Sequence, residues 1–549
     1  MQTSYSFVLN IIKLKVEGMK YVFISVFGLL WVYGSLQTVN AQSNKSEGSG
    51  QPFVNGVTID PEARLVQYDR MLFGQFIEHF HRQIYGGIFD PGSKLSDSDG
   101  FRIDVMDAIR ELKVPIVRWP GGCFVSAYHW LEGVGNKRSP TYDKAWKVEE
   151  PNTFGTDEYI SWCRKIGAEP YICTNAGTGT MEEMSDWVEY CNLNIGKFGR
   201  MRISNGHTDP YHVLFWSVGN ENWGGHEIGA KTVTEWGELV RESAKMMRTV
   251  SPGLKLFAAA LPDKKWTLPL LKEAGFLLDY VSIHGYWDPL WAVNNISPYM
   301  VCMMRTGQPE ESIKQTIEIL DESGFRGKIK IAFDEWNLRG WHHPDLSDFR
   351  NKMDIKARDK NDINSTYTMA DALFSACFLN SCLRHAEDVK IACFAPVVNA
   401  RGTLFVHPAG IVKRTTFHVL SMYANLLEKY VLPVTISSEP LIYGNKSTPA
   451  LDVILTCNES KTRFVYVIVN KNPSKEIAFN PDFNRLNIKI PKQLVATVLS
   501  GKGPDDYNDI GSENAIVPVQ DIFKVSNGMI TVPAHSLIIL PVNRDKKTD

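Results

Sequence analysis

The sequence predicts an α/β protein in which a (β/α)8 (TIM) barrel is followed by a C-terminal antiparallel β-sandwich. From about residue 70 to 430, short apolar runs alternate with amphipathic helical patterns, and eight such pairs can be counted. After about residue 430, short strand-like segments follow one another without a long helix between them. Strict strand–helix alternation requires parallel pairing with helical crossovers, and eight units are the number that closes such a barrel.

The predicted barrel strands are residues 72–76, 116–119, 171–174, 213–218, 255–259, 280–284, 329–333 and 391–396. The predicted helices are residues 101–112, 156–166, 181–193, 233–249, 268–273, 311–323, 365–383 and 415–428. A doubly wound open sheet is the alternative architecture. It would not require eight units, and the sequence has no glycine-rich dinucleotide-binding loop.

The segments outside residues 70–430 predict export and a sandwich. Residues 1–41 are interpreted as a signal peptide, because an apolar run from Tyr21 to Tyr33 precedes small residues at 39–41. That run is shorter than the roughly 18 residues of a spanning helix. We therefore expect an exported, periplasmic or extracellular protein without a stable membrane span in its mature form; a retained N-terminal anchor is the alternative. Residues 42–52 are a polar linker.

Residues 53–69 are expected to contribute one or more strands to the sandwich, whose main part is residues 431–549. Its predicted strands are residues 431–436, 450–458, 463–470, 486–489, 493–500 and 529–540. They alternate in hydrophobicity and are separated by turn residues, as in antiparallel sandwiches.

Composition excludes several classes of function. The net charge of −2 argues against a nucleic-acid partner and gives no sign of electrostatic membrane binding. The nine cysteines include no CxxC pair, so neither a structural zinc site nor a dense disulfide framework is expected. Aromatic residues make up 11% of the chain, and tryptophan also stacks on sugar faces, which weakly favours a carbohydrate ligand.

Polar residues follow seven of the eight predicted barrel strands, at the edge where (β/α)8 enzymes build their active sites. A single polar group at a strand end is unremarkable, but repetition around a barrel indicates a site. The residues concerned are Glu78, His79, Arg118, Cys123, Asn175, Asn220, Glu221, His284, Tyr286, Glu335 and Asn399.

Glu221 and Glu335 follow the fourth and seventh strands, and we expect their carboxylates to face each other across the barrel mouth. A separation of about 5 Å would suit a retaining glycosidase, and one of roughly 6.5–9.5 Å an inverting one. The Asn220 amide could bond a sugar hydroxyl. The alternative is that both glutamates are solvated loop residues, but their matching contexts, flanked by Asn220 and Trp336, favour a pair.

The motifs Trp216-Ser217-Val218-Gly219-Asn220-Glu221 and Phe333-Asp334-Glu335-Trp336 resemble those of the clan A retaining glycoside hydrolases. More narrowly, Gly74-Gln75-Phe76-Ile77-Glu78-His79 and Arg118-Trp119-Pro120-Gly121-Gly122-Cys123-Phe124 resemble the α-L-arabinofuranosidases of glycoside hydrolase family fifty-one. The resemblance covers about residues 53–545.

The resemblance implies roles for individual residues. Glu221 is similar to the general acid/base and Glu335 to the nucleophile. Sugar contacts are implied for Glu78, Cys123, Asn220, Tyr286 and Asn399, although some members have Asn in place of Cys123 and Gln in place of Asn399. Arg118 and His284 are expected to support the carboxylates. An ionised Glu335 would raise the pKa of Glu221 and so favour its acid role.

The resemblance also implies release of terminal non-reducing α-L-arabinofuranosyl residues from plant cell-wall arabinan, arabinoxylan or arabino-oligosaccharides. No cofactor or metal is expected, because two carboxylates suffice for double displacement. A homo-oligomer, a trimer or hexamer, is implied as well. The alternatives are a clan A endo-glucanase or β-xylosidase on the same barrel, and a non-catalytic carbohydrate-binding protein, which would lack one of the carboxylates.

Overall fold

The computed structural model describes residues 54–342 and 359–544. The predicted signal peptide and the linker lie outside these residues. Two units, Met1–Pro52 and Phe53–Asp549, divide the chain, and all described residues belong to the second. Among the described helices, none combines the length and apolar character that a membrane crossing requires.

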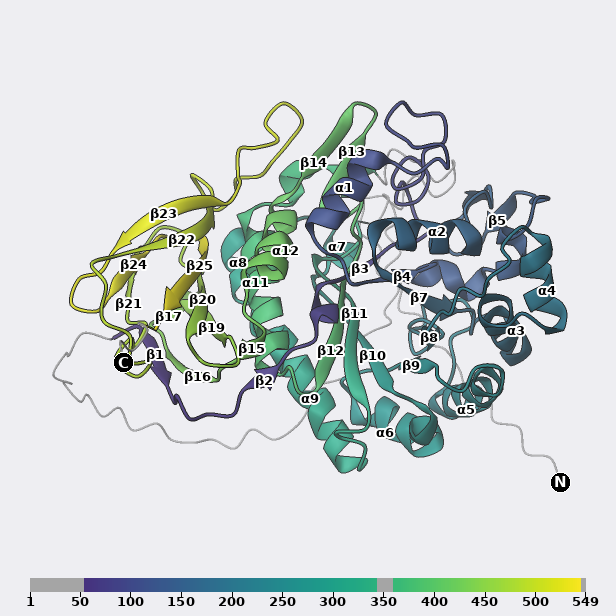
Figure 1. Cartoon of the computed structure of the whole chain (residues 1–549), viewed down its shortest axis with the longest axis horizontal. Coiled ribbons are helices and arrows are strands. Elements are labelled where there is room, and N and C mark those ends of the chain that lie inside the picture. The colour runs from purple at the N-terminus through teal and green to yellow at the C-terminus, as the bar shows by residue number, and fades with distance from the viewer. Residues whose placement is uncertain (1–53, 343–358, 545–549) are drawn as a thin grey trace, which may run out of the picture. The chain divides into compact units, whose positions relative to one another are not determined.

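Eight parallel strands form a closed barrel, which confirms the predicted (β/α)8 architecture (Figure 1). In chain order they are β3 (Gly74–Phe76), β4 (Ile116–Trp119), β7 (Glu169–Thr174), β8 (Phe215–Val218), β9 (Lys255–Ala259), β10 (Tyr280–Asp288), β11 (Lys330–Arg339) and β12 (Val389–Phe394). β12 pairs with β3, so the last strand returns to the first and no edge is left open.

Helices follow the barrel strands along the chain. They are α1 (Ile103–Glu111), α2 (Thr156–Ile166), α3 (Met181–Asn192), α4 (Gly196–Ser204), α5 (Val233–Val250), α6 (Lys264–Ala274), α7 (Leu290–Val293), α8 (Tyr299–Met303), α9 (Gln308–Glu322), α11 (Met369–Arg384) and α12 (Thr415–Leu426). Thr232 caps α5 and Thr368 caps α11, each with an acidic residue at the third helical position, which satisfies main-chain N–H groups at both helix starts.

The first predicted strand begins later than its apolar run suggested. Arg70–Phe73 forms the 3-10 helix η1, because the Asp69 side chain accepts a hydrogen bond from the Met71 amide and turns the chain. β3 therefore starts at Gly74, where a Cβ would lie 2.8 Å from the Ala392 carbonyl oxygen of β12. Only glycine permits this close strand approach.

A β-bulge in β11 determines which side chains enter the barrel mouth. Ser282 of β10 pairs with Ala332, but His284 pairs with Glu335, so β11 carries one additional residue over this interval. Neighbouring residues of a regular strand point to opposite faces, whereas a bulge turns a side chain to a new direction. As a result the consecutive residues Asp334 and Glu335 both lie within 3.5 Å of the Arg118 guanidinium.

The C-terminal region is antiparallel, as predicted. Its main sheet has the order β2-β15-β19-β20-β25-β22-β23. The strands are β2 (Val66–Gln67), β15 (Tyr430–Val431), β19 (Leu451–Cys457), β20 (Arg463–Asn470), β22 (Gln493–Ser500), β23 (Val519–Lys524) and β25 (Ser536–Asn543). Smaller pairs join β1 (Gly56–Ile59) to β16 (Val434–Ser437), β17 (Pro440–Tyr443) to β18 (Lys446–Pro449), and β21 (Ile477–Phe479) to β24 (Ile530–Val532).

Three strand predictions in this region are wrong. Residues 431–436 are divided into β15 and β16, because Leu432 and Pro433 belong to no strand. Residues 486–489 include the end of a turn and form no strand. The predicted strand 529–540 is divided into β24 and β25 by a turn at Ala534-His535. These errors arise because an apolar residue beside a turn or break has the same local pattern as a strand residue. β1 and β2 lie in the antiparallel region, paired with β16 and β15.

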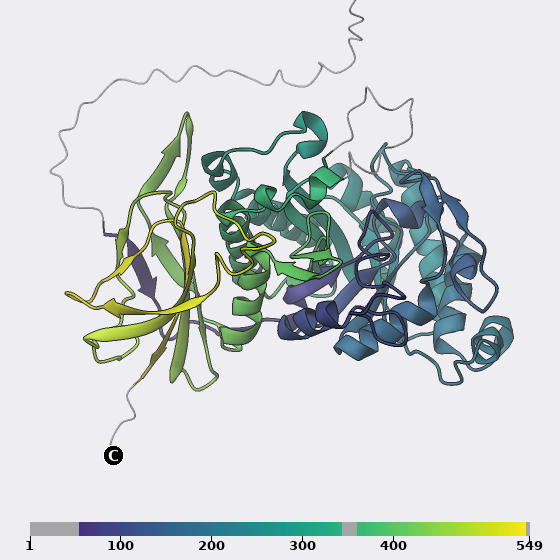
Figure 2. The same ribbon diagram turned by 90° about the horizontal axis from the view of Figure 1, so that it is seen from above.

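Helix α11 packs between the barrel and the main antiparallel sheet (Figure 2). It contacts β11 and β12 on one side and β19, β20 and β25 on the other. A helix covered on both sides must be apolar around its circumference, and its residues from Met369 to Leu383 are all buried. At its end Arg384 donates hydrogen bonds to Asp452 of β19 at 2.7 Å and to Glu310 of α9 at 2.8 Å.

Arg339, at the end of β11, fixes the start of α11. Its guanidinium donates two hydrogen bonds to Asp371 at 2.9 and 3.0 Å and one to Asp288 at 2.7 Å, and all three residues are at most 2% exposed. Arg339→Met should lower the free energy of unfolding by about 3–5 kcal/mol, because it leaves two buried carboxylates with fewer partners. Urea unfolding followed by circular dichroism measures this change.

The matched control is Lys264→Met, which removes an exposed ion pair with Glu322. Exposed pairs stabilise little, so its unfolding midpoint should stay close to that of the wild type. Equal midpoints for the two variants would contradict the role given to Arg339.

Candidate active site

Glu221 and Glu335 meet at the carboxyl ends of the barrel strands. Glu221 lies just beyond β8 and Glu335 lies within β11. One carboxylate oxygen of each, together with a ring nitrogen of His284, lie within 4.8 Å of one another. Such close oxygens are compatible with the carboxylate pair of double displacement, whose carboxyl groups are about 5–5.5 Å apart.

Arg118, on β4, links the Glu335 carboxylate to the Asn220 amide, which is the neighbour of Glu221. It is fully buried at the end of β4. One terminal nitrogen donates to Glu335 Oε2 at 2.8 Å and the other to Asn220 Oδ1 at 2.7 Å. Its guanidinium also lies over the Phe76 ring, 5.2 Å from the centroid. The planar fork thereby fixes the position of one carboxylate and of the amide beside the other.

Glu221 accepts a hydrogen bond on each oxygen. His284 Nδ1 lies 2.8 Å from Oε1 and His226 Nε2 lies 2.8 Å from Oε2. Burial disfavours the charged carboxylate, but the two histidines outweigh it and hold the pKa of Glu221 below its ordinary value. The prediction that an ionised Glu335 would raise the pKa of Glu221 is therefore wrong for this arrangement, because each Glu221 oxygen accepts a hydrogen bond from a histidine.

The His284 imidazole is protonated in this arrangement. Burial opposes its charge, but Glu335, Asp334 and Glu221 outweigh burial and raise the pKa of His284 to about 10. Asp334 is fully buried and accepts hydrogen bonds from Tyr171 Oη at 2.6 Å and Ser282 Oγ at 2.7 Å. Its Oδ1 lies 3.5 Å from His284 Nε2, so the imidazole lies between two carboxylates.

Glu78 lies beyond β3, and its carboxyl group is buried. Its Oε1 accepts hydrogen bonds from the Phe124 amide at 3.0 Å and Trp146 Nε1 at 3.1 Å. Burial and the charge of Glu335 raise the pKa of Glu78 to about 8, so it is mainly protonated at neutral pH. A Cβ at Gly121 would lie 2.3 Å from Glu78 Cγ, which explains why the chain has glycine there.

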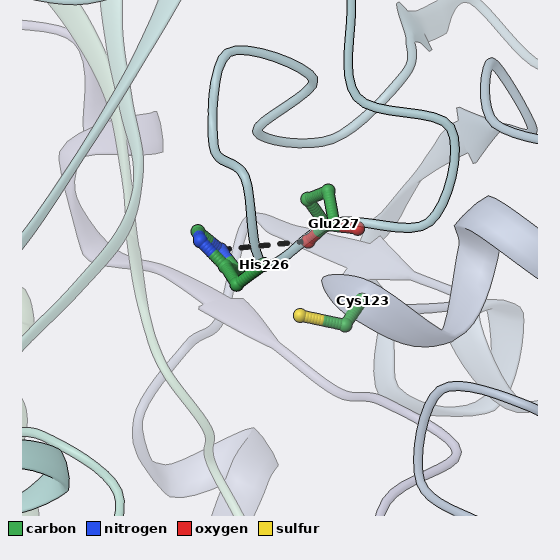
Figure 3. Close-up of side chains that lie close together, drawn as sticks. All are labelled: Cys123, His226 and Glu227. Carbon is green, nitrogen blue, oxygen red and sulfur yellow. Dashed lines mark ion pairs between the residues drawn. The ribbon is translucent and has the colours of Figure 1, made fainter. Parts of the chain in front are cut away.

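Cys123 begins the 3-10 helix η2 (Cys123–Ala127), and its thiol lies beside Glu227 (Figure 3). Burial and the neighbouring carboxylate of Glu227 raise the pKa of Cys123 well above its ordinary value. The thiol is therefore protonated and can act as a hydrogen-bond donor. Glu227 also accepts from Asn220 Nδ2 and from Ser126 Oγ, both at 2.8 Å.

Tyr286 and Asn399, both predicted sugar contacts, have different surroundings. Tyr286 donates to Glu335 Oε1 at 2.6 Å, and Arg401 lies over its ring at 4.8 Å. Asn399 is fully buried, and its amide donates to the Arg82 carbonyl and accepts from the Val406 amide, both at 2.7 Å. The Asn399 amide is thus fixed by the main chain on both of its ends, and its second N–H is left for a sugar hydroxyl.

Sequence reasoning did not identify Asp334, His226, Glu227, Trp146 and Arg401. The acidic pair Asp334-Glu335 was visible, but strand alternation would have placed the two side chains on opposite faces. His226 and Glu227 lie in the loop between β8 and α5, and Trp146 lies between the hairpin strands β5 (Thr141–Asp143) and β6 (Val148–Glu150). Loops of this kind carry no periodic signal.

The barrel and the paired carboxylates define a retaining glycoside hydrolase of the two-carboxylate class. Two family profiles match the chain: "Alpha-L-arabinofuranosidase 1 domain" over residues 108–302 and "Alpha-L-arabinofuranosidase C-terminal domain" over residues 334–536. Alpha-L-arabinofuranosidase C of Emericella nidulans is 32% identical over 88% of this chain and 97% of its own length. An intracellular exo-alpha-(1->5)-L-arabinofuranosidase of Acetivibrio thermocellus is 30% identical over 86% and 96%.

Solved structures agree with this assignment. The α-L-arabinofuranosidase of Thermotoga maritima, in an arabinose complex, has a TM-score of 0.78 at 30% identity, over 89% of this chain and all of that one. A thermostable GH51 α-L-arabinofuranosidase from Thermotoga petrophila has a TM-score of 0.76 at 30% identity, with the same coverage. The chain belongs to the α-L-arabinofuranosidases of glycoside hydrolase family 51.

The raised pKa of Glu78 predicts a pH-dependent stability that Glu78→Gln should remove. The folded-state pKa of about 8 exceeds the ordinary value of 4.5, so the contribution of Glu78 is complete below about pH 4.5 and is lost as pH rises to about 8. The glutamine carbonyl can still accept from Phe124 and Trp146. Urea unfolding at about pH 5, 7 and 9 should show the wild type losing stability relative to Glu78→Gln.

Glu318→Gln, on the exposed face of α9, is the matched control and should follow the wild type at every pH. A stability difference between Glu78→Gln and the wild type that does not change with pH would show that Glu78 is ionised throughout.

Proposed function

We propose that this protein is a retaining exo-acting α-L-arabinofuranosidase in which Glu335 is the nucleophile and Glu221 the general acid/base. The observation that carries the proposal is the spacing of the two carboxylates, whose nearest oxygens lie within 4.8 Å at the carboxyl end of the barrel. Membership of family 51 supports the furanoside substrate. An endo-glucanase or β-xylosidase would use the same pair, but the chain matches the arabinofuranosidase profiles on both of its halves.

In the first step Glu335 attacks the anomeric carbon, forming an ester bond while the glycosidic bond breaks. Arg118 bonds Glu335 Oε2 and Tyr286 bonds Oε1, so both oxygens are oriented before substrate arrives. Glu221 gives a proton to the leaving oxygen, which departs as a hydroxyl. In the second step Glu221 takes a proton from water, which attacks the same carbon and releases arabinose with its configuration retained.

Two histidines, His284 and His226, control the protonation of Glu221. In the free protein the protonated His284 donates a hydrogen bond to Glu221 Oε1, while His226 is hydrogen-bonded to Oε2. The His226 side chain is 52% exposed, so a leaving group that approaches Oε2 can displace it. Loss of that hydrogen bond raises the pKa of Glu221, and the proton can then move from His284 to the carboxyl group that must donate it.

Sugar hydroxyls are proposed to contact five side chains: Glu78, Cys123, Asn220, Tyr286 and Asn399. The Asn220 amide is held on one end by Arg118 and on the other by Glu227, which leaves one N–H for the substrate. Glu78 and Cys123 are both protonated at neutral pH and can donate. A pocket lined by donors of fixed direction discriminates among sugars, because a misplaced hydroxyl leaves buried polar groups unpaired.

The proposed substrates are arabinan, arabinoxylan and their oligosaccharides, cleaved at terminal non-reducing residues. Export and homo-oligomerisation into a trimer or hexamer belong to the same proposal. Export is supported by the apolar run and small residues before position 42. Fractionation of host cells with N-terminal sequencing tests export; protein found only in the cytoplasm and still beginning at Met1 or Met19 would contradict it.

The substrate assignment predicts a specific hydrolysis pattern. An aryl α-L-arabinofuranoside should be cleaved at least about 10²-fold more efficiently than the matching arabinopyranoside or β-xyloside, a ratio within reach of hydrogen-bond discrimination. Proton NMR should show α-arabinofuranose as the first product anomer. Preference for the xyloside, or an inverted first product, would exclude the proposed reaction.

The roles of the two carboxylates predict different defects. Glu335→Gln should abolish detectable turnover on every substrate, because no ester can form. Glu221→Ala should keep more activity on aryl glycosides with good leaving groups, which need no proton, and azide should restore turnover as an arabinosyl azide. Initial rates and product analysis measure both, with Glu318→Gln as the active control. Full activity of Glu335→Gln would refute the assignment.

A further inference from the structure

Cys123, His226 and Glu227 bring three different ligand types together beside the catalytic pair. One ligand atom of each lies within 4.8 Å of the other two. Figure 3 shows the side chains converging from two elements, Cys123 from the start of η2 and the other two from the loop after β8. The mechanism proposed above uses the Cys123 thiol as a sugar contact and requires no metal at this place.

The ligand set has the chemistry of a zinc site. Zn²⁺ binds thiolate, imidazole and carboxylate at about 2.0–2.3 Å, and three protein ligands leave one position for water. Mg²⁺ and Ca²⁺ prefer all-oxygen sites and do not fit this set. The Glu227 side chain is fully buried, whereas that of His226 is 52% exposed, so a small rotation of the imidazole would close the distances around an ion.

We propose that Cys123, His226 and Glu227 form a binding site for a thiophilic divalent cation of the Zn²⁺ class, and that its occupancy inhibits the glycosidase. Binding forms a sulfur–metal bond, and the thiol proton passes to solvent. The inhibitory part of this inference rests on the proposed function, while metal binding itself does not.

Inhibition follows from what each ligand does in the free protein. His226 Nε2 lies 2.8 Å from Glu221 Oε2, and Glu227 Oε1 accepts from Asn220 at 2.8 Å. A bound cation would occupy the Cys123 sulfur, weaken the hold of Glu227 on Asn220 and add positive charge beside Glu221. The ion would therefore remove or displace two of the proposed sugar contacts, Cys123 and Asn220, and would lie beside the carboxylate that the leaving group must approach.

Cobalt binding tests the site directly and without substrate. Tag-free protein, treated with chelator and desalted, is titrated with Co²⁺, which takes zinc sites and reports a thiolate ligand by a near-ultraviolet charge-transfer band. We expect about one Co²⁺ per chain, and displacement of the band by Zn²⁺. Cys123→Ser should lose the band. His212→Asn, which removes an exposed histidine elsewhere, should keep it.

The other eight cysteines are buried, so they should not contribute a band in folded protein. No band at one equivalent of Co²⁺, or the same band in Cys123→Ser, would overturn the proposed site.

An activity measurement tests the inhibition. Saturating Zn²⁺ should lower kcat/KM on aryl α-L-arabinofuranoside by about 10²-fold, because loss of the Cys123 and Asn220 contacts leaves buried polar groups of the sugar unpaired. Mg²⁺ at the same concentration should not, and arabinose should compete with Zn²⁺. Residual activity of Cys123→Ser should resist Zn²⁺; equal sensitivity would overturn the proposal. If the substrate is not cleaved at all while the cobalt band is present, the proposed function fails and the metal site stands.

Discussion

The buried guanidinium of Arg118 is the interaction on which the barrel mouth depends. It contacts Glu335 and Asn220 directly and lies 3.5 Å from Asp334, and all of these groups are almost completely removed from solvent. A buried carboxylate costs several kcal/mol unless a partner and further hydrogen bonds compensate it. Arg118 provides that partner from β4 for the two carboxylates on β11, and it also holds the Asn220 amide just beyond β8.

The bulge in β11 makes this arrangement possible. In a regular strand Asp334 and Glu335 would point to opposite faces, and only one could reach Arg118. The additional residue between Ala332 and Glu335 turns both carboxylates inward. Asp334 then contacts Tyr171 and Ser282 inside the barrel, and Glu335 remains available to substrate at the mouth. A local irregularity of the main chain thus separates a carboxylate bonded inside the barrel, Asp334, from the proposed nucleophile, Glu335.

The sequence predicted the barrel because strands of a parallel sheet are covered on both faces and form continuous apolar runs. Glu221 and Glu335 were predictable because barrel sites lie beyond strand ends. The partners of these residues were not, since they depend on geometry without a local signal. Asp334 depends on a bulge, and His226 and Glu227 depend on how a loop folds back over Asn220. The misassigned segment 486–489 shows the same limit, because hydrophobicity alone does not separate strand from turn.

The distribution of protons completes the electrostatic argument. Five carboxyl groups surround the site: Glu78, Glu221, Glu227, Asp334 and Glu335. Arg118 alone could not balance five negative charges in a buried space. Glu78 remains neutral because its pKa rises to about 8, and His284 becomes positive because its pKa rises to about 10. These two protons lower the net charge that the barrel must bury. His284 Nδ1 also lies 2.8 Å from Glu221 Oε1, so the protonated imidazole that stabilises the free site is also the proton source of the proposed mechanism.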